Sequence, residues 1–450
     1  MMTRNILILH DTGGPSLTSQ PSFSKFISTS DGVRLLIISS KVSEADKVGA
    51  LAYAEIASPC TTGALEIAAW EFHKLHTIHE IYTQQEDLIL RAAQLRVLFG
   101  ISVESLHPSA ALCFRDKVLM KERVAAAGFN IPKFARVWSP ANVIQFINEF
   151  GYPVVVKPSL GSASASVTVL RSDLDRNRYL TSEFYSRIDD AGKCMDYSGD
   201  IIIESFAKGS MVHVNGYAHF GKLEIAWPFK YINTNLSFTS GSAYGNVLIP
   251  ANTPHHTALL SAAQRVLESL PCPQHLSFHL ELFEQQDEKT GAFSYTLCEI
   301  AARRPGGSIG NLIERCESGS TSLIGAYTPN FLFVEMDFRC AIGLPLRHNR
   351  ATVSRYARGD PGFSVADLIV PLRKGILVRV PEVAECPIPN VQIVQIAKTG
   401  TVYQGFNINT MNTCVRLVAV SQEQESVTEQ DMEQRLRRAE EWYQSQVIYS

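Results

Sequence analysis

The stretch HLELFEQQDEKTGAFSYTLCEIAARRPGG, residues 279–307, decides the fold. Two apolar runs, at 278–283 and 295–300, flank a polar loop at 285–291 that contains a glycine. Apolar runs of this length on either side of a short polar loop are typical of a β-hairpin. We therefore expect two neighbouring antiparallel strands here.

Two glutamates occupy matching positions on these strands. If the hairpin is symmetric, its midpoint falls at Thr290, and Glu281 then lies directly opposite Glu299. Like charges in a cross-strand pair repel each other. A hard divalent cation with carboxylate and phosphate oxygens as ligands removes this repulsion, so the pair predicts a Mg²⁺ site shared with a nucleotide. The residues alone leave the alternative open that one carboxylate faces solvent or pairs with an arginine.

A basic, glycine-containing loop follows the second glutamate. Arg303 and Arg304 precede Pro305, Gly306 and Gly307. This loop suggests phosphate binding, because a guanidinium follows a predicted metal carboxylate. The glycines after it allow the backbone to approach an anion closely. An ordinary surface turn has the same composition, and this alternative also stays open.

A second basic site is expected near residue 157. Lys157 ends the apolar run that starts at Tyr152, so its stem is expected to be buried and its ammonium to need an anion. The segment from Ser159 to Ser166 consists mostly of Ser, Ala and Gly, which can offer backbone N–H groups and hydroxyls to phosphate. A plain hairpin turn is the alternative. Lys117, at the start of a helix, would by default be a solvated surface lysine.

The remaining pattern predicts further elements in the order that an α/β protein of several domains would have. Short apolar runs at 5–9 and 33–39 predict buried parallel strands. Apolar periodicity predicts helices between Gln84 and Gly100 and between Asp116 and Gly128. Further strands are expected at 152–158, 167–170 and 201–204, and short strands and turns after residue 330. A terminal amphipathic helix is expected behind a capping box of Ser426 and Glu429.

Length and composition describe an ordinary globular protein. The chain has 450 residues, 45% hydrophobic and 19% charged, with a net charge of -3. This number of residues predicts two or three domains. A balanced charge without a basic stripe argues against nucleic-acid binding. Nine scattered cysteines without a C-x-x-C pair indicate free thiols in a reducing compartment. The first apolar run is too short for a signal or membrane segment. We therefore expect a cytoplasmic protein.

Five motifs in order resemble those of the ATP-grasp superfamily. They are Arg115-Asp-Lys117, Pro153-Val-Val-Val-Lys157-Pro158, Ile203-Glu-Ser-Phe206, His279-Leu-Glu281 and Glu299-Ile-Ala-Ala-Arg303. The last motif, followed by Gly-Gly, looks most like the L-amino-acid ligase and carnosine-synthase-like branch. The match covers roughly residues 80–325.

The resemblance implies an α/β fold, with α+β central lobes, and an arrangement of domains. An N-terminal Rossmann-like βα domain would occupy 1–112, a small ATP-grasp lobe acting as lid 113–205, and a large lobe with the metal site 206–330. A C-terminal α+β subdomain, 331–450, would pack on the large lobe. The two central lobes would clasp ATP between them.

The resemblance also implies roles for single residues. Lys117 and Lys157 would hold the ATP phosphates and the adenine side, and Glu204 would accept a hydrogen bond from the adenine amino group. Arg303 would be the catalytic residue that steadies the transferring phosphoryl group. The remaining implied residues are the phosphate-covering loop (Ser162, Ala163, Ser164, Ser166), the adenine slot (Phe206, Ala207), the magnesium carboxylates (Glu281, Glu299) and, with Arg303, the substrate contacts (Gly306, Gly307).

Three positions depart from the family's pattern. Ser166 stands where the family usually has Gly, and Ala301 stands where many members have a metal-binding Asn, although Ala is normal in the amino-acid ligase branch. Met211 lies where a ribose-binding acid is expected. His213 or Asn215 could supply that sugar contact instead. The polar and aromatic segment from Tyr231 to Gly245 is expected to form part of the substrate pocket, with an ordinary polar loop as the alternative.

The implied activity is an ADP-forming ligase. It would activate a carboxylate as an acyl phosphate and join it to an amine, with an amino acid and a second amino acid or small amine as substrates. ATP and Mg²⁺, for which Mn²⁺ could substitute, are the implied cofactors, and a homodimer is compatible with the sequence. A carboxylase or purine-type ligase and a non-catalytic ATP-binding module are the alternatives.

Overall fold

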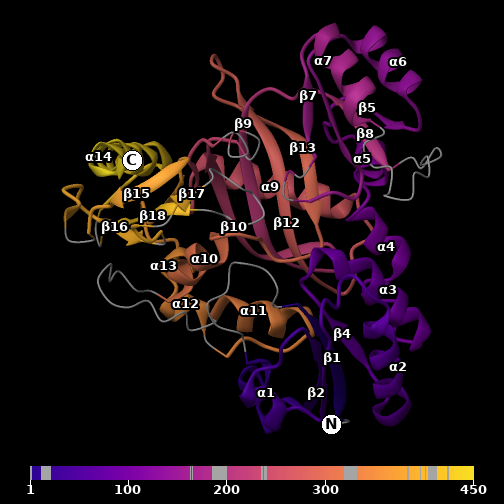
Figure 1. Cartoon of the computed structure of the whole chain (residues 1–450). Coiled ribbons are helices and arrows are strands. Elements are labelled where there is room, and N and C mark those ends of the chain that lie inside the picture. The colour runs from indigo at the N-terminus through magenta and orange to yellow at the C-terminus, as the bar shows by residue number, and fades with distance from the viewer. Residues whose placement is uncertain are drawn as a thin grey trace.

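The computed structural model describes most of the chain. The described residues are 3–11, 22–162, 164, 166–184, 200–234, 237, 241–318, 332–347, 349–382, 385–395, 397–400, 402–403, 413–422 and 425–450. Four sheets organise them (Figure 1). No described helix is long and apolar enough to pass through a bilayer.

The N-terminal part is a parallel four-stranded sheet in the order β3-β2-β1-β4. The continuous apolar runs of β1 and β2 are buried, as predicted for central parallel strands. Because the chain moves outward from β1 through β3 and then returns to β4, the order reverses between β1 and β4. The bounds are β1 Arg4–His10, η1 Phe23–Phe26, η2 Thr29–Asp31, β2 Val33–Ser39, α1 Glu44–Gly49, β3 Ala52–Glu55, α2 Ala64–His76, β4 Glu80–Tyr82, η3 Glu86–Leu88, α3 Ile89–Leu98 and α4 Pro108–Cys113.

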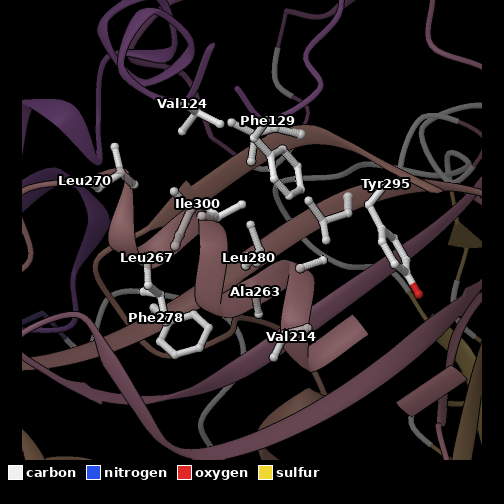
Figure 2. Close-up of a cluster of buried hydrophobic side chains, with 14 of the residues drawn as sticks. Val124, Phe129, Val214, Ala263, Leu267, Leu270, Phe278, Leu280, Tyr295 and Ile300 are labelled. Atoms are coloured by element: carbon white, nitrogen blue, oxygen red, sulfur yellow. The ribbon is translucent and has the colours of Figure 1, made fainter. Parts of the chain in front are cut away.

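The helix predicted after Asp116 is confirmed as α5, Lys117–Ala126. The Asp116 side chain accepts from the backbone N–H groups of Val118 and Leu119, and Gly128 ends the segment with φ of 77°. Val124 of this helix packs into the apolar core of the large lobe (Figure 2). The helix therefore fastens the small lobe to the large one.

The small lobe is a four-stranded sheet in the order β5-β8-β6-β7. The predicted hairpin is confirmed, because β6 and β7 pair antiparallel with Val154 opposite Leu170. The bounds are β5 Phe134–Val137, α6 Pro140–Phe150, β6 Val154–Pro158, β7 Thr168–Leu170, α7 Asp173–Arg178, the π-helical turn η4 Tyr179–Glu183 and β8 Ile201–Ser205.

The large lobe is built on an eight-stranded sheet in the order β13-β12-β9-β10-β11-β14-β18-β16. Its bounds are β9 Ser210–His219, β10 Lys222–Ile232, β11 Tyr244–Leu248, α9 Pro254–Glu268, β12 His275–Gln286, β13 Phe293–Ala301 and α10 Ile309–Ser318. One face packs on α9, where Val214 and Leu280 meet Ala263 and Leu267 (Figure 2). On the opposite face, α10 covers one end with apolar side chains around Trp227.

The C-terminal part continues the same sheet. Strands β14, β18 and β16 extend it beyond β11, so these residues share the large lobe's sheet as well as packing on it. The bounds are β14 Val365–Pro371, β15 Gly375–Arg379, β16 Val391–Gln395, β17 Val402–Tyr403, β18 Thr413–Val420, α14 Glu429–Gln446 and β19 Ile448–Tyr449. A small sheet in the order β17-β15-β19 lies beside it.

Two expectations for this part are wrong. The chain after residue 330 was expected to alternate strands and turns, but three helices come first: α11 Leu332–Ala341, α12 Arg350–Val353 and α13 Arg355–Arg358. Helix α11 packs on the N-terminal sheet through Phe338, a contact across the whole chain that local pattern cannot reveal. The capping box of the last helix is made by Thr428 and Asp431, because the helix begins at Glu429.

Candidate functional site

The predicted carboxylate pair forms. Glu281 on β12 lies opposite Glu299 on β13, and the register shifts directly afterwards, so that Leu282 faces Leu297. The bulge leaves Cys298 as the extra residue of β13. Both carboxylates therefore lie on the same face of the sheet. This is the face on which α10 packs around Trp227, and the carboxylates lie outside the area that α10 covers.

Each carboxylate has a different partner. The hydroxyl of Tyr231 donates to Oε1 of Glu281 at 2.6 Å, and Nε2 of His279 lies 3.4 Å from the same oxygen. Nζ of Lys117 lies 2.9 Å from Oε2 of Glu299. Burial alone would raise the pKa of both carboxyls. The pKa of Glu281 is nevertheless lowered, because His279 and Tyr231 form hydrogen bonds with its carboxylate. The pKa of Glu299 is lowered by the nearby cations of Lys117 and Lys157. Both groups are therefore ionised at neutral pH, as a metal ligand must be.

A second cluster of charges lies near this pair, around the buried Glu204 of β8. Nζ of Lys157 is 2.9 Å from one carboxylate oxygen, and Nζ of Lys121 is 3.3 Å from the other. Burial would raise the pKa of Glu204, but the two lysines lower it. The acceptor predicted for an adenine amino group is thus held in place by two ammonium groups.

Lys121 was not among the residues predicted from the sequence. Its side chain is fully buried and donates to the backbone carbonyls of Leu297, at 3.3 Å, and Cys298, at 2.7 Å, beside the bulge. Burial lowers the pKa of this ammonium despite the nearby Glu204. The signal that could have found it is its position four residues after Lys117, on the same face of α5.

The phosphate-loop candidates lie between β6 and β7. Ser164 and Ser166 both have φ of 56°, a left-handed conformation that costs a residue with a Cβ about 1–2 kcal/mol. Ser166 thus adopts the conformation for which glycine is favoured at this position. Ser162 is described and Ala163 lies outside the described residues. Nζ of Lys117 donates to the Gly161 carbonyl at 2.6 Å, which ties this loop to the carboxylate pair.

Arg303 is fixed by an acidic residue from the N-terminal part. Its Nε donates to Glu86, which also binds the guanidinium of Arg115. Burial would raise the pKa of Glu86, and the two arginines lower it. Glu86, in the turn η3, was not among the predicted site residues, because its partners are distant in sequence. Gly306 and Gly307 lie just before α10, with open space around them and φ of 60° at Gly307.

His213 does not fit the predicted sugar contact. Its side chain is fully buried, stacked against Tyr231 at 4.3 Å between ring centroids. Burial lowers its pKa to about 3, with a further contribution from His279. Both ring nitrogens already have protein partners, Asn215 at 3.1 Å and Asn246 at 3.1 Å. The alternative Asn215 is likewise buried and bonded, so neither residue is placed for a sugar.

These residues instead belong to a polar row that runs from β12 to β18, across six neighbouring strands of the sheet. Nδ1 of His279 donates to Asn215 at 2.7 Å, Asn215 donates to His213, and His213 donates to Asn246. These donor directions follow from the amide and ring orientations in the structure. The row ends where Asn246 donates to Asp367 at 2.8 Å and Nη2 of Arg416 lies 2.9 Å from the same carboxylate.

The polar row has a contact to the candidate site at each of its ends. One end reaches Glu281 through His279. At the other end, Arg416 donates to the carbonyl of Ser308, at the start of α10 and next to Gly307. The row thus links the carboxylate pair to the predicted substrate loop.

The remaining predicted residues lie at the margins. Phe206 is 41% exposed and follows Glu204 directly, and Ala207 is half-buried. Met211 is buried against Tyr231 and Cys298. Of the predicted pocket segment, the rings of Tyr231 and Tyr244 contact each other in a tilted arrangement beside Glu281, at 5.4 Å between ring centroids.

Comparisons with known proteins agree on the fold. No protein-family model matches the chain. The L-amino acid ligase of Bacillus licheniformis superimposes with a TM-score of 0.65 at 14% identity, with both chains covered over 100% of their length. The N5-carboxyaminoimidazole ribonucleotide synthetase of Thermotoga maritima superimposes with a TM-score of 0.58 at 16% identity, covering 99% of this chain and 100% of that one. The chain has the ATP-grasp fold.

Curated relatives match part of the chain. The L-arginine-specific L-amino acid ligase of Bacillus subtilis is 24% identical over 247 residues, 54% of this chain and 56% of the relative. The D-alanine–D-alanine ligase of Geobacter sulfurreducens is 28% identical over 179 residues, 39% of this chain and 52% of the relative. The chain thus spans about half the length of the curated relatives it matches. Its sequence resembles the L-amino-acid ligases within the ATP-grasp superfamily.

Proposed function

We propose that this chain, with its ATP-grasp fold, is an ATP-dependent carboxylate–amine ligase that joins an amino acid to a second amino acid or small amine. The carrying observation is the cross-strand pair of Glu281 and Glu299 with Lys117 bound to Glu299. The names of the relatives, an L-amino acid ligase and a D-alanine–D-alanine ligase, support amide formation between amino acids.

The carboxylate pair fits a magnesium ion. Two ionised oxygen ligands on one face of a sheet are the donor set that Mg²⁺ prefers, and the remaining positions suit water and phosphate oxygens. When bound, the ion would neutralise charge on the ATP phosphates. The hydrogen bond from Tyr231 restrains the Glu281 carboxylate for this task.

The ATP phosphates would lie between the carboxylate pair and the loop after β6. Lys117 contacts both Glu299 and the Gly161 carbonyl, so its ammonium stands where the two meet. Serines at 162, 164 and 166 could cover the phosphates with hydroxyl and backbone N–H groups. Glu204, with Phe206 and Ala207 next to it, would receive the adenine, and Lys157 would lie on the same side.

The proposed reaction needs no nucleophilic side chain. An oxygen of the acid substrate attacks the γ-phosphorus of ATP, the bond to the β,γ-bridging oxygen breaks, and ADP leaves. The nitrogen of the amine then attacks the acyl carbon, inorganic phosphate leaves, and the nitrogen loses a proton. Arg303, held by Glu86, would stabilise the negative charge on the transferring group and on the tetrahedral carbon centre.

The first test is a grid of amino acids and small amines incubated with ATP and Mg²⁺. We expect phosphate release in particular pairs and, by mass spectrometry, an amide whose mass equals the sum of the two substrates minus water. Glu299→Gln, with unchanged thermal stability, should reduce both signals about 10²- to 10³-fold. Phosphate release with bicarbonate and an amine, giving a carboxylated product, would instead support a carboxylase. ATP binding without turnover in every well would support the non-catalytic alternative.

A further inference from the structure

Arg303 and Arg304 are consecutive but differ in their surroundings. The guanidinium of Arg303 is paired with Glu86. The backbone N–H of Arg304 donates to the side chain of Gln84 at 2.5 Å, whereas its side-chain Nη1 is buried and has no hydrogen-bond partner in the described part of the chain. A buried guanidinium nitrogen without an acceptor is costly, which indicates that a ligand supplies the acceptor.

Arg304 lies near the edge of the N-terminal sheet at which β1 and β4 end. His10 ends β1 and Tyr82 ends β4, and the strand order reverses between these two strands. Crevices at the carboxyl ends of parallel strands, at such a reversal, are the usual ligand sites of open α/β sheets. Arg304 lies close enough to alter the pKa of both His10 and Tyr82.

His10 offers a second donor without a partner. It is 6% exposed, and its pKa is lowered to about 4, first by burial and then by Arg304, so the ring is neutral at physiological pH. The side-chain amide of Gln85 lies 3.3 Å from Nδ1 and donates to it, which places the ring proton on Nε2. Nε2 is buried without a partner among the described residues. Two donors near each other therefore lack an acceptor.

The groups around Arg304 include two buried carboxylate oxygens that also lack a partner in the described residues, Oε2 of Glu314 and Oδ1 of Asp337. Burial raises the pKa of Glu314, on α10, to about 7. Asp337, on α11, accepts from the hydroxyl of Tyr82 at 2.5 Å. A ligand that carries a carboxylate together with hydrogen-bond donors satisfies this set of atoms, and an amino acid is such a ligand.

We propose that Arg304 and His10 bind the free carboxylate of an amino acid that serves as the amine-donating substrate. This inference rests on the proposed ligase function. The carboxylate of the acid substrate is consumed in the reaction, whereas that of the amine donor remains charged throughout and needs a permanent partner. Because Arg304 follows Arg303 directly, a carboxylate held by Arg304 keeps the attached amine near the site of the acyl group. The enzyme would therefore discriminate against amines that lack a carboxylate.

The experiment uses the acid substrate identified in the grid and three amine donors. These are an amino acid, its carboxamide, and hydroxylamine, which traps the acyl phosphate as a hydroxamate without needing a carboxylate site. In the wild type, the carboxamide should have a KM at least 10-fold above that of the amino acid. Arg304→Ala should raise the KM of the amino acid about 10- to 100-fold, the range expected for a lost charge-assisted hydrogen bond, and leave that of the carboxamide unchanged.

Controls separate the possible failures. Arg304→Lys should recover part of the KM difference between the amino acid and its carboxamide. His10→Leu should reduce this KM difference less than Arg304→Ala does. The exposed Arg379 is paired with Glu385, and Arg379→Ala should behave as the wild type. Hydroxamate formation by Arg304→Ala at the wild-type rate shows an intact fold and activation step. Equal KM values for the amino acid in Arg304→Ala and the wild type, with hydroxamate formed by both, would overturn the carboxylate site and leave the ligase standing. Absence of hydroxamate and amide in the wild type would overturn the ligase itself.

Discussion

The two sides of the candidate site differ in whether their buried charged and polar groups have partners. On the proposed nucleotide side, Glu204 and Glu299 are bound by lysines, so the charges neutralise one another before any ligand arrives. On the proposed acceptor side, Arg304 and His10 each keep a buried donor without a partner among the described residues. Paired charges hold a preformed geometry, whereas unpaired groups mark the place where a ligand completes the structure.

The largest effect is expected from breaking the paired side at its centre. Glu204→Ala leaves the ammonium groups of Lys121 and Lys157 buried without their shared carboxylate. Removal of one partner from a buried ion pair costs about 3–5 kcal/mol. Urea unfolding should show a loss of this size, and the exposed counterpart Glu385→Ala should lose less than about 1 kcal/mol. Equal losses in the two variants would show that burial does not set the value of these pairs.

Removing the charge but not the shape of a metal ligand should reduce turnover. Glu299→Gln is expected to lower kcat about 10²- to 10³-fold at saturating ATP, as loss of one electrostatic contact in an active site does. Thermal stability should change little, because the amide still accepts from Lys117. Glu288→Gln, in the exposed turn of the same hairpin, is the matched control. Full activity of the Glu299→Gln variant at all Mg²⁺ concentrations would contradict the assignment of the metal ligand.

The polar row offers an intermediate test. Asn246→Ala removes the acceptor of His213 and the donor to Asp367 in a fully buried place. Unpaired buried groups cost about 1–3 kcal/mol, and we expect a loss in this range by chemical unfolding. The exposed Asn177→Ala should be close to neutral. A neutral Asn246→Ala would mean that water replaces the amide and that the row is not tightly packed.

The smallest effect is expected at His255, which forms an ion pair with Glu429 at the start of α14. Nε2 of His255 lies 2.5 Å from Glu284, and Nδ1 lies 3.1 Å from Glu429. Burial would lower the pKa of His255, but the two carboxylates outweigh burial and raise this pKa to about 9. A pKa raised in the folded state adds stability that is complete below the unfolded value of 6.5 and is lost as pH rises through 9.

This pH dependence can be measured by unfolding the wild type and His255→Gln at pH 6 and pH 10. The wild type should exceed the variant by about 1 kcal/mol at pH 6, and the difference should vanish at pH 10. A constant difference at both values would assign the contribution of His255 to packing rather than to its charge.

Local pattern predicted the elements that carry the site. A symmetric hairpin centred on Thr290 predicted the pairing of Glu281 with Glu299, but the pairs nearer the turn, such as Glu284 with Tyr295, are centred half a residue earlier. The two glutamates meet because the bulge at Cys298 shifts the register, which the sequence pattern did not show. The start of α5 followed from Asp116, because a cap acts within three residues of the helix end. Such features depend on interactions between residues that are close in the chain.

The sequence by itself determined these strands, caps and charged residues, and tertiary structure decided which of the charges meet. Lys121 binds a carbonyl 177 positions away, and Tyr82 binds Asp337 across 255 positions. From the sequence, His213 was expected to be an accessible polar residue, but it is a buried member of the row because the neighbouring strands assemble around it. Burial and pairing depend on all neighbours in space at once, which is why Arg303 and Arg304, adjacent in sequence, have different surroundings.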